Sequence, residues 1–187
     1  MRSLISIILF LAAKLAISEI TSYTHADSLK ATNPLGCIPF QEIESDSTAA
    51  DVVAGATACL NEKRYAEAAE FVMIASALVN YDTRRVKDRS SHMAQQTLFM
   101  QAFTNQPQEA VGELLDQIDL LTPDSEKHTQ ICRHLRNIGH PTYFPKYMIA
   151  HGMDALNESQ NQPLVEPFDA ETAWDTTLTE FTNCAVE

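Results

Sequence analysis

Long segments of this chain repeat apolar residues at the spacing of an α-helix, and few glycines interrupt them. The whole sequence contains five glycines, and no long segment alternates apolar and polar residues as a half-buried strand does. The pattern therefore predicts an all-α fold in which short connections join antiparallel helical hairpins.

Polar caps and helix breakers give the expected bounds of the helices. Ser47, Asn105, Thr122 and Asp169 stand where N-caps are expected, and Gly139 is placed to end a helix. The second helix is apolar on two faces, so we expect it at the centre of the molecule. The predicted helices cover residues 47–61, 64–80, 90–102, 105–121, 122–138, 146–151 and a segment that begins after residue 169.

The last predicted helix carries Trp174, Leu178 and Phe181 on one face, and Cys184 continues the same spacing. We therefore expect the disulfide of Cys184 to lie on the buried side of this helix. In the preceding stretch, residues 154–169, the acidic and polar composition and two prolines predict a surface loop.

The first residues have the layout of a secretory signal peptide. Arg2 is followed by an apolar run, Leu4 to Ala13, which Lys14 ends, and small residues follow. The run is shorter than the roughly 20 apolar residues that cross a bilayer. We expect cleavage after Ser18, with Ala26 as the alternative, and a mature chain without a membrane span in the periplasm or outside the cell.

All four cysteines lie downstream of this leader: Cys37, Cys59, Cys132 and Cys184. An even number of cysteines in an oxidising compartment indicates two disulfides, for which three pairings are possible. We favour Cys37–Cys59 and Cys132–Cys184, because these pairs would hold the two ends of the chain, where little core is expected.

A metal site is not expected, because there is no Cys-x-x-Cys and Cys132 lies too close to His134 in sequence for a usual ligand pair. His128, His134 and His140 are spaced so that successive side chains turn by about 240° on a helix. They cannot share one face. We expect His128 at the edge of the core and His134 in solvent, and no cofactor.

Removal of residues 1–18 leaves enough chain for one core. We expect an extended acidic arm over residues 19–46 and a single helical domain over 47–187. The formal net charge is −12, and losing Arg2 and Lys14 with the leader makes it −14. This charge disfavours nucleic acid and anionic membranes as partners, and it favours either a well-solvated surface alone or a basic protein partner.

The segment Arg64-Tyr65-Ala66-Glu67-Ala68-Ala69-Glu70-Phe71, followed by Ala75 and by Ala94-Gln95-Gln96-Thr97-Leu98, resembles a Sel1-like or tetratricopeptide helical hairpin. The resemblance covers about residues 64–100. It implies that a tyrosine and small alanines pack paired helices, and that stacked hairpins form a concave surface for protein partners.

Two segments offer candidate contacts with a partner. The first, residues 140–153, contains the candidates His140, Tyr143, Phe144 and Tyr147 for a recognition patch; the alternative is that Tyr143, Tyr147 and Met148 pack beneath the C-terminal helix and Trp174. The second, residues 82–89, contains the candidates Arg84 and Arg85. These arginines either bind an anion or lie in a turn between helices, paired with the aspartates of the same segment.

No recognised catalytic signature occurs in the chain, which favours binding over catalysis. The main hypothesis is an exported helical protein that binds a protein partner, for example a periplasmic inhibitor of immunity type. One alternative is a small exported hydrolase with His140 or His151 as general base, oriented by a carboxylate such as Asp154. The other is a structural accessory protein of the cell envelope.

Overall fold

The computed structural model describes residues 28–157 and 162–185. The predicted signal peptide lies outside these residues, whether it ends at residue 18 or at residue 26. Within the described ranges the chain forms helices and no β-strand, which confirms the predicted all-α class. No helix in this part of the chain has the length and apolarity that a bilayer crossing requires.

The described residues form seven α-helices and four short helical turns. The α-helices are α1 (Ala49–Asn61), α2 (Tyr65–Arg85), α3 (Ala94–Phe103), α4 (Gln108–Asp119), α5 (Glu126–Ile138), α6 (Lys146–Ile149) and α7 (Ala170–Thr176). Short 3₁₀ helices occupy Phe40–Glu42, Arg89–Met93 and Met153–Asn157. A π-helical turn, Thr177–Phe181, continues α7.

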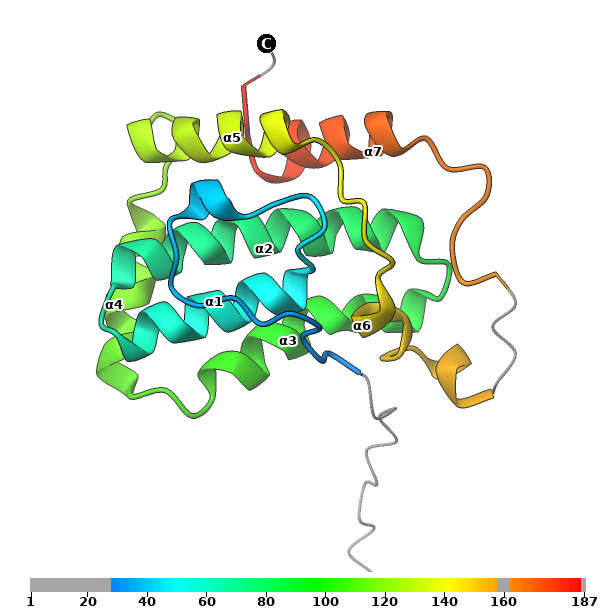
Figure 1. The fold of residues 1–187 in the computed structure, drawn as a ribbon, viewed down its shortest axis with the longest axis horizontal. Helices are drawn as coiled ribbons and strands as arrows, with labels where there is room; N and C mark the ends of the chain where they lie inside the picture. The colour runs from blue at the N-terminus through cyan, green and yellow to red at the C-terminus, as the bar shows by residue number, and fades with distance from the viewer. Residues whose placement is uncertain (1–27, 158–161, 186–187) are drawn as a thin grey trace, which may run out of the picture.

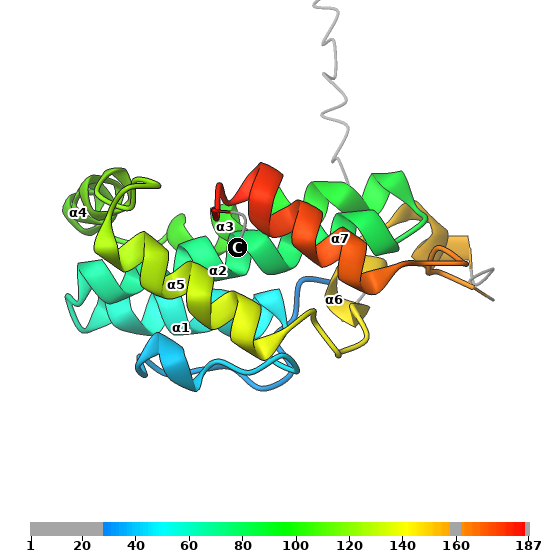
Figure 2. The same cartoon turned by 90° about the horizontal axis from the view of Figure 1, so that it is seen from above.

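The central element is α2, as the two apolar faces of its sequence predict. Figures 1 and 2 show α5 and α7 on one side of α2 and α1 and α3 on the other, while α4 crosses one end of it. Ala68, Ala69, Ala75 and Ala77 of α2 are buried, and such small side chains let neighbouring helices approach closely. The helices thus enclose α2 on several faces.

The contact between α1 and α2 is close enough to require a glycine. A Cβ atom on Gly55 of α1 would lie 2.2 Å from the ring of Phe71, which is itself fully buried in α2. Because the ring is enclosed, it has little room to move away. Gly55 therefore sets the distance between the two helices.

Both disulfides have the pairing that we favoured. Cys37 bonds to Cys59 with Cα atoms 4.7 Å apart, and Cys132 bonds to Cys184 with Cα atoms 5.5 Å apart. Two disulfides in one chain are typical of proteins from an oxidising compartment.

The expectation of little core in the arm is wrong. Leu29, Phe40 and Ile43 are all buried, and the 3₁₀ helix Phe40–Glu42 packs against α2. The His134 side chain of α5 contributes to this packing. It is half-buried rather than solvent-exposed, because its Nε2 donates a hydrogen bond to the carbonyl of Ile43 at 2.9 Å. Disulfide and core contacts together fix the arm.

Three predicted N-caps differ from the observed ones. Thr48, not Ser47, caps α1, because only Thr48 forms a reciprocal capping box with Asp51 three residues later. No side chain caps α4. The helix begins after Pro107 instead of at Asn105, because helical backbone is disfavoured for the residue before a proline. The observed caps of α5 and α7 are Ser125 and Asp169.

Helix α5 begins later than predicted, because the chain first turns from α4 towards α5. Residues 122–125 form a turn, closed by a hydrogen bond from the Ser125 amide to the Thr122 carbonyl at 2.9 Å. This turn carries the chain from α4 at the end of α2 to α5, which lies above α2 in Figure 1. Thr122 therefore belongs to the connection. At the other end, Gly139 ends α5 with a positive φ of 73°, as predicted.

The predicted turn over residues 82–89 is partly wrong, because α2 continues to Arg85. Asp82 and Arg85 form an ion pair within the helix, and no helix breaker precedes Val86. Val86 is extended and forms an isolated bridge with Leu164. The turn therefore starts four residues later than Asp82, and Asp88 caps the 3₁₀ helix that follows.

The buried stripe of the last helix is also shorter than predicted. Trp174 and Leu178 are buried, but Phe181 is 38% exposed. The π-helical turn is wider than an α-helical turn, so Phe181 leaves the stripe. Cys184 returns to the core and bonds to α5.

Candidate functional site

An apolar groove lies between α4, the start of α5 and the C-terminal end of the chain. Its floor is formed by α2 and its volume is about 220 Å³. Figure 2 shows α4, the start of α5 and the C-terminal end of the described chain near one another beside α2. We call it the α2–α4 groove; it is lined by Ala69, Val72, Met73, Ser76, Ile118, Leu121, Pro123, His128 and residues 181–183.

One wall of the groove is a C-terminal hook, residues 182–184, which the disulfide holds against α5. The buried His128 ring donates a hydrogen bond from Nε2 to the carbonyl of Thr182 at 2.8 Å, and the Thr182 hydroxyl donates to the carbonyl of Leu178 at 2.6 Å. The amide of Cys184 donates to the same Leu178 carbonyl at 2.8 Å. His128 therefore lies at the edge of the core, as predicted, and positions the hook.

The helix beside the groove is acidic and partly apolar on its outer side. We call this surface the α4 face; its exposed residues are Glu109, Glu113, Leu115, Asp116, Asp119 and Leu120. Leu115 is 55% exposed and Leu120 is 64% exposed. Large apolar side chains in such positions are typical of interaction surfaces when they lie together.

No lysine or arginine occurs between Arg89 and Lys127 in the sequence, although this stretch contains all the acidic residues of the α4 face and also Asp124 and Glu126. Lys127 itself is engaged elsewhere, because its Nζ lies 2.8 Å from the Glu70 carboxylate and faces the ring of Phe40. The α4 face is thus a locally concentrated negative charge in an already acidic chain.

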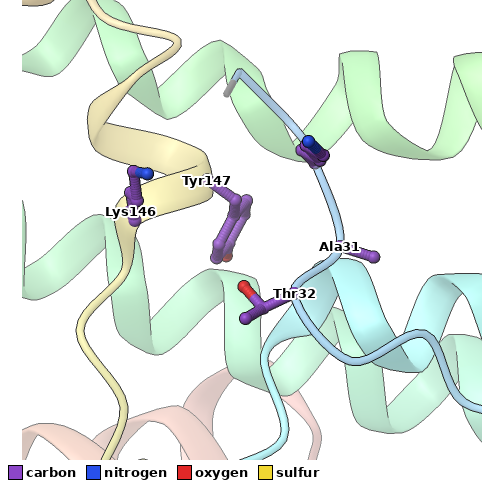
Figure 3. Close-up of a pocket in the computed structure, with 5 residues that line it drawn as sticks. Ala31, Thr32, Lys146 and Tyr147 are labelled. Atoms are coloured by element: carbon purple, nitrogen blue, oxygen red, sulfur yellow. The ribbon is translucent and has the colours of Figure 1, made fainter. Parts of the chain in front are cut away.

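A second pocket has the opposite character. It lies between the arm and α6, has a volume of about 240 Å³, and is lined by Lys30, Ala31, Thr32, Lys146 and Tyr147. Figure 3 shows the Thr32 hydroxyl directed towards the ring of Tyr147. Two exposed lysines at one pocket do not by themselves define a binding site. The polar side chains that lie beneath the pocket show what this region does.

Beneath this pocket, the fully buried carboxylate of Asp82 joins α2 to the segment around α6. The hydroxyls of Tyr143 and Tyr147 donate to its Oδ2 at 2.9 Å and 2.6 Å. Arg85 donates from Nε to Oδ1 at 2.8 Å, and its guanidinium lies 4.9 Å from the ring centres of Tyr81 and Tyr143. We call these five residues the Asp82 cluster.

The electrostatics of the Asp82 cluster follow from its burial. Burial raises the pKa of Asp82, while Arg85 and the two hydroxyls oppose the rise. Burial and the Asp82 charge raise the pKa of Tyr147 well above its usual value, and they act in the same way on the half-buried Tyr143. The Asp82 carboxylate accepts from Arg85 and from both tyrosines, so the cluster ties α2 to the segment around α6 and its direct role is structural.

The structure separates the candidate residues of segment 140–153. Tyr147 is 3% exposed and Met148 is fully buried, so their side chains are not available to a partner in this structure. Phe144 is 56% exposed. His140 stacks on Tyr81 and lies 3.5 Å from the Glu171 carboxylate.

The two candidate arginines lie in different surroundings. Arg84 is partly exposed and donates a hydrogen bond to Asn80 one turn earlier in α2, whereas Arg85 is buried in the Asp82 cluster. A partner could therefore reach Arg84 and Phe144, but not Arg85.

The proposed general bases do not form a common site. His151 Nδ1 lies 2.8 Å from the Ser28 hydroxyl, and burial lowers the pKa of His151. Asp154 contacts the Asp88 carboxylate through its backbone amide, and among the described residues no hydrogen bond joins Asp154 to His151. In the same part of the chain, no group of three or more His, Cys, Asp or Glu side chains is placed to hold a metal ion.

Comparisons with protein-family models, with curated proteins and with solved structures find no match to this chain. The structure itself defines the class, an all-α protein with two disulfides. The candidate binding surface is inferred from the arrangement of its residues. Sequence reasoning did not identify the α2–α4 groove. The stretch without lysine or arginine beside exposed leucines was the signal in the sequence that could have indicated it.

Proposed function

We propose that the protein is exported and acts by binding a protein partner whose contact surface is basic. The observation that carries this proposal is the α4 face, where exposed leucines alternate with acidic residues and no basic side chain follows in sequence until Lys127. Such a surface combines apolar area with a negative potential that attracts and orients a positive partner.

Export is supported by the leader-like N-terminal sequence and by the two disulfides, which form and persist in oxidising compartments. Sequencing the N-terminus of the mature chain from its native source tests this step. A chain that retains residues 1–18 and is isolated with reduced cysteines would contradict it.

One role that fits these properties is an inhibitor of immunity type, which neutralises a basic toxic enzyme by covering its active surface. The resemblance of residues 64–100 to helical hairpins that bind proteins supports the same class of function. Both ideas concern binding, so one experiment on the α4 face tests their common requirement.

The experiment compares two variants that lose the same charge from different surfaces. Glu113→Gln, Asp116→Asn and Asp119→Asn together neutralise the α4 face, whereas Glu42→Gln, Glu44→Gln and Asp46→Asn neutralise the exposed side of the arm. Each tagged chain is used to capture partners from an extract of the native compartment, and bound proteins are identified by mass spectrometry.

We expect the wild-type chain and the arm variant to retain the same basic protein, and the α4 variant to lose it. Retention should also weaken as salt is raised, because the attraction between the exposed charges is screened. Equal retention by the two variants would contradict a role of the α4 face.

A second candidate function is hydrolysis, favoured by the hydrogen bond between Ser28 and His151. A histidine at 2.8 Å from a serine hydroxyl has the distance of a general base and its nucleophile. The test measures cleavage of a small ester by the disulfide-bonded chain and by the variants Ser28→Ala and His151→Ala. Turnover that both substitutions leave unchanged would eliminate this site.

A further inference from the structure

We propose that the α2–α4 groove receives one apolar side chain of the partner, from a segment in which arginine or lysine flanks that side chain. This inference rests on the proposed function and specifies which partner chemistry the surface accepts. In this inference the groove provides the specific contact, and the α4 face provides the negative potential around that contact.

The lining of the groove favours an apolar side chain. Val72 and Met73 on the floor and Ile118 on the α4 side are partly exposed, so each retains apolar surface that an incoming side chain would remove from water. The volume of about 220 Å³ is below the roughly 300–1,000 Å³ of pockets for drug-sized ligands. The groove therefore fits the end of a side chain better than a cofactor.

Exposed acidic residues flank the lining residues in sequence and favour basic neighbours for that side chain. Asp119, Asp124 and Glu180 are exposed, and each is adjacent in sequence to a residue that lines the groove. An acidic residue next to the inserted side chain would meet like charge, whereas arginine or lysine would meet opposite charge. A basic segment with one apolar side chain is therefore the occupant that fits both the lining and the acidic residues that flank it in sequence.

The hook prepares the groove before a partner arrives. Phe181 and Thr182 form its C-terminal wall, and the disulfide to Cys132 and the hydrogen bond from His128 hold that wall in place. A preformed wall reduces the conformational entropy that binding must remove.

The test uses three acetylated and amidated peptides on the full disulfide-bonded chain: Arg-Gly-Phe-Gly-Arg, Glu-Gly-Phe-Gly-Glu and Arg-Gly-Ala-Gly-Arg. Methyl resonances of Val72, Met73, Ile118 and Leu121 are followed by NMR during titration. We expect saturable shifts with the first peptide and affinities at least roughly tenfold weaker with the other two, the effect of losing a buried phenylalanine or reversing the flanking charges. Equal shifts for all three peptides, or shifts confined to other methyl groups, would overturn the inference.

Two substitutions separate this inference from the proposed function. Val72→Phe fills the groove, and Met100→Phe makes a similar change on the exposed side of α3. We expect Val72→Phe to abolish both peptide shifts and capture of the natural partner, while Met100→Phe changes neither; thermal unfolding of each variant verifies its fold. Phe181→Ala, which removes part of the wall, should weaken the peptide if Val72→Phe fails to fold.

If neutralising the α4 face prevents capture but Val72→Phe and Phe181→Ala do not weaken it, the groove inference fails and the proposed function stands. If neither the α4 variant nor the groove variants affect capture, both fail.

Discussion

Replacing Asp82 with asparagine should strongly destabilise the protein, because it leaves a buried cation without its counter-charge. Asp82 is fully buried and Arg85 is 7% exposed, and Arg85 Nη2 lies 2.7 Å from Asp82 Oδ1. Removing one partner of such a buried pair costs about 3–5 kcal/mol. Asparagine can accept hydrogen bonds from the two tyrosines only with its NH2 group facing the Arg85 donors, so we expect a loss within this range, at least about 3 kcal/mol.

The assay is urea unfolding of the oxidised protein, followed by circular dichroism. A loss of about 3 kcal/mol should also lower the Tm by roughly 6–12 °C for a chain of this size. The matched control is Glu67→Gln, which removes the charge from an ion pair with Arg64 that is more than one-third exposed. Solvent-exposed ion pairs add little to stability, so this variant should unfold nearly as the wild type does.

The reasoning would be refuted if Asp82→Asn and Glu67→Gln changed the free energy of unfolding equally. A further check is Tyr147→Phe in the Asp82→Asn background. Because Tyr147 donates to Asp82 at 2.6 Å, the two substitutions should be non-additive. Strict additivity would show that the hydroxyl and the carboxylate contribute independently.

Three further outcomes follow from the packing. Gly55→Ala should destabilise the chain by about 1–3 kcal/mol through its clash with Phe71, less up to about 1 kcal/mol of gained helix propensity; thermal unfolding that is unchanged or improved would contradict the close contact. Burial raises the pKa of Tyr143 and Tyr147, so stability should be retained below about pH 10 and lost as the pH rises towards their folded-state values. Ultraviolet titration should show these phenols ionising together with unfolding, and ionisation in the native chain near pH 10 would be evidence against this. Full reduction of the disulfides should loosen the chain ends and diminish the near-ultraviolet circular dichroism of Trp174; an intact signal would oppose it.

Local patterns in the sequence predicted the helical class, and among three possible disulfide pairings the sequence favoured the one that the structure shows. The 3.6-residue period identifies α2 as central, since its two apolar faces require neighbours on both. The positions of Cys37 and Cys184 near the ends of the chain made their pairing with Cys59 and Cys132 the simplest choice. These features depend on residues close in sequence or on few long-range contacts.

The errors arise where tertiary contacts decide between local alternatives. Ser47 and Thr48 are both good caps, and only the capping box with Asp51 distinguishes them. In the sequence alone, Asp82 and Arg85 are typical of a charged turn. The structure shows that Asp82 also contacts Tyr147, which is distant in sequence. The α2–α4 groove combines α2, α4, α5 and the C-terminus, so no local pattern could define it.

The C-terminal hook links the stability of the chain to its proposed binding surface. Cys184 bonds to Cys132 next to a ring, His128, that itself holds Thr182 at the groove. The same few contacts therefore fix the last residues on α5 and shape one wall of the groove. Because the disulfide and this hydrogen bond hold the hook against α5, the groove has a defined form before any partner binds.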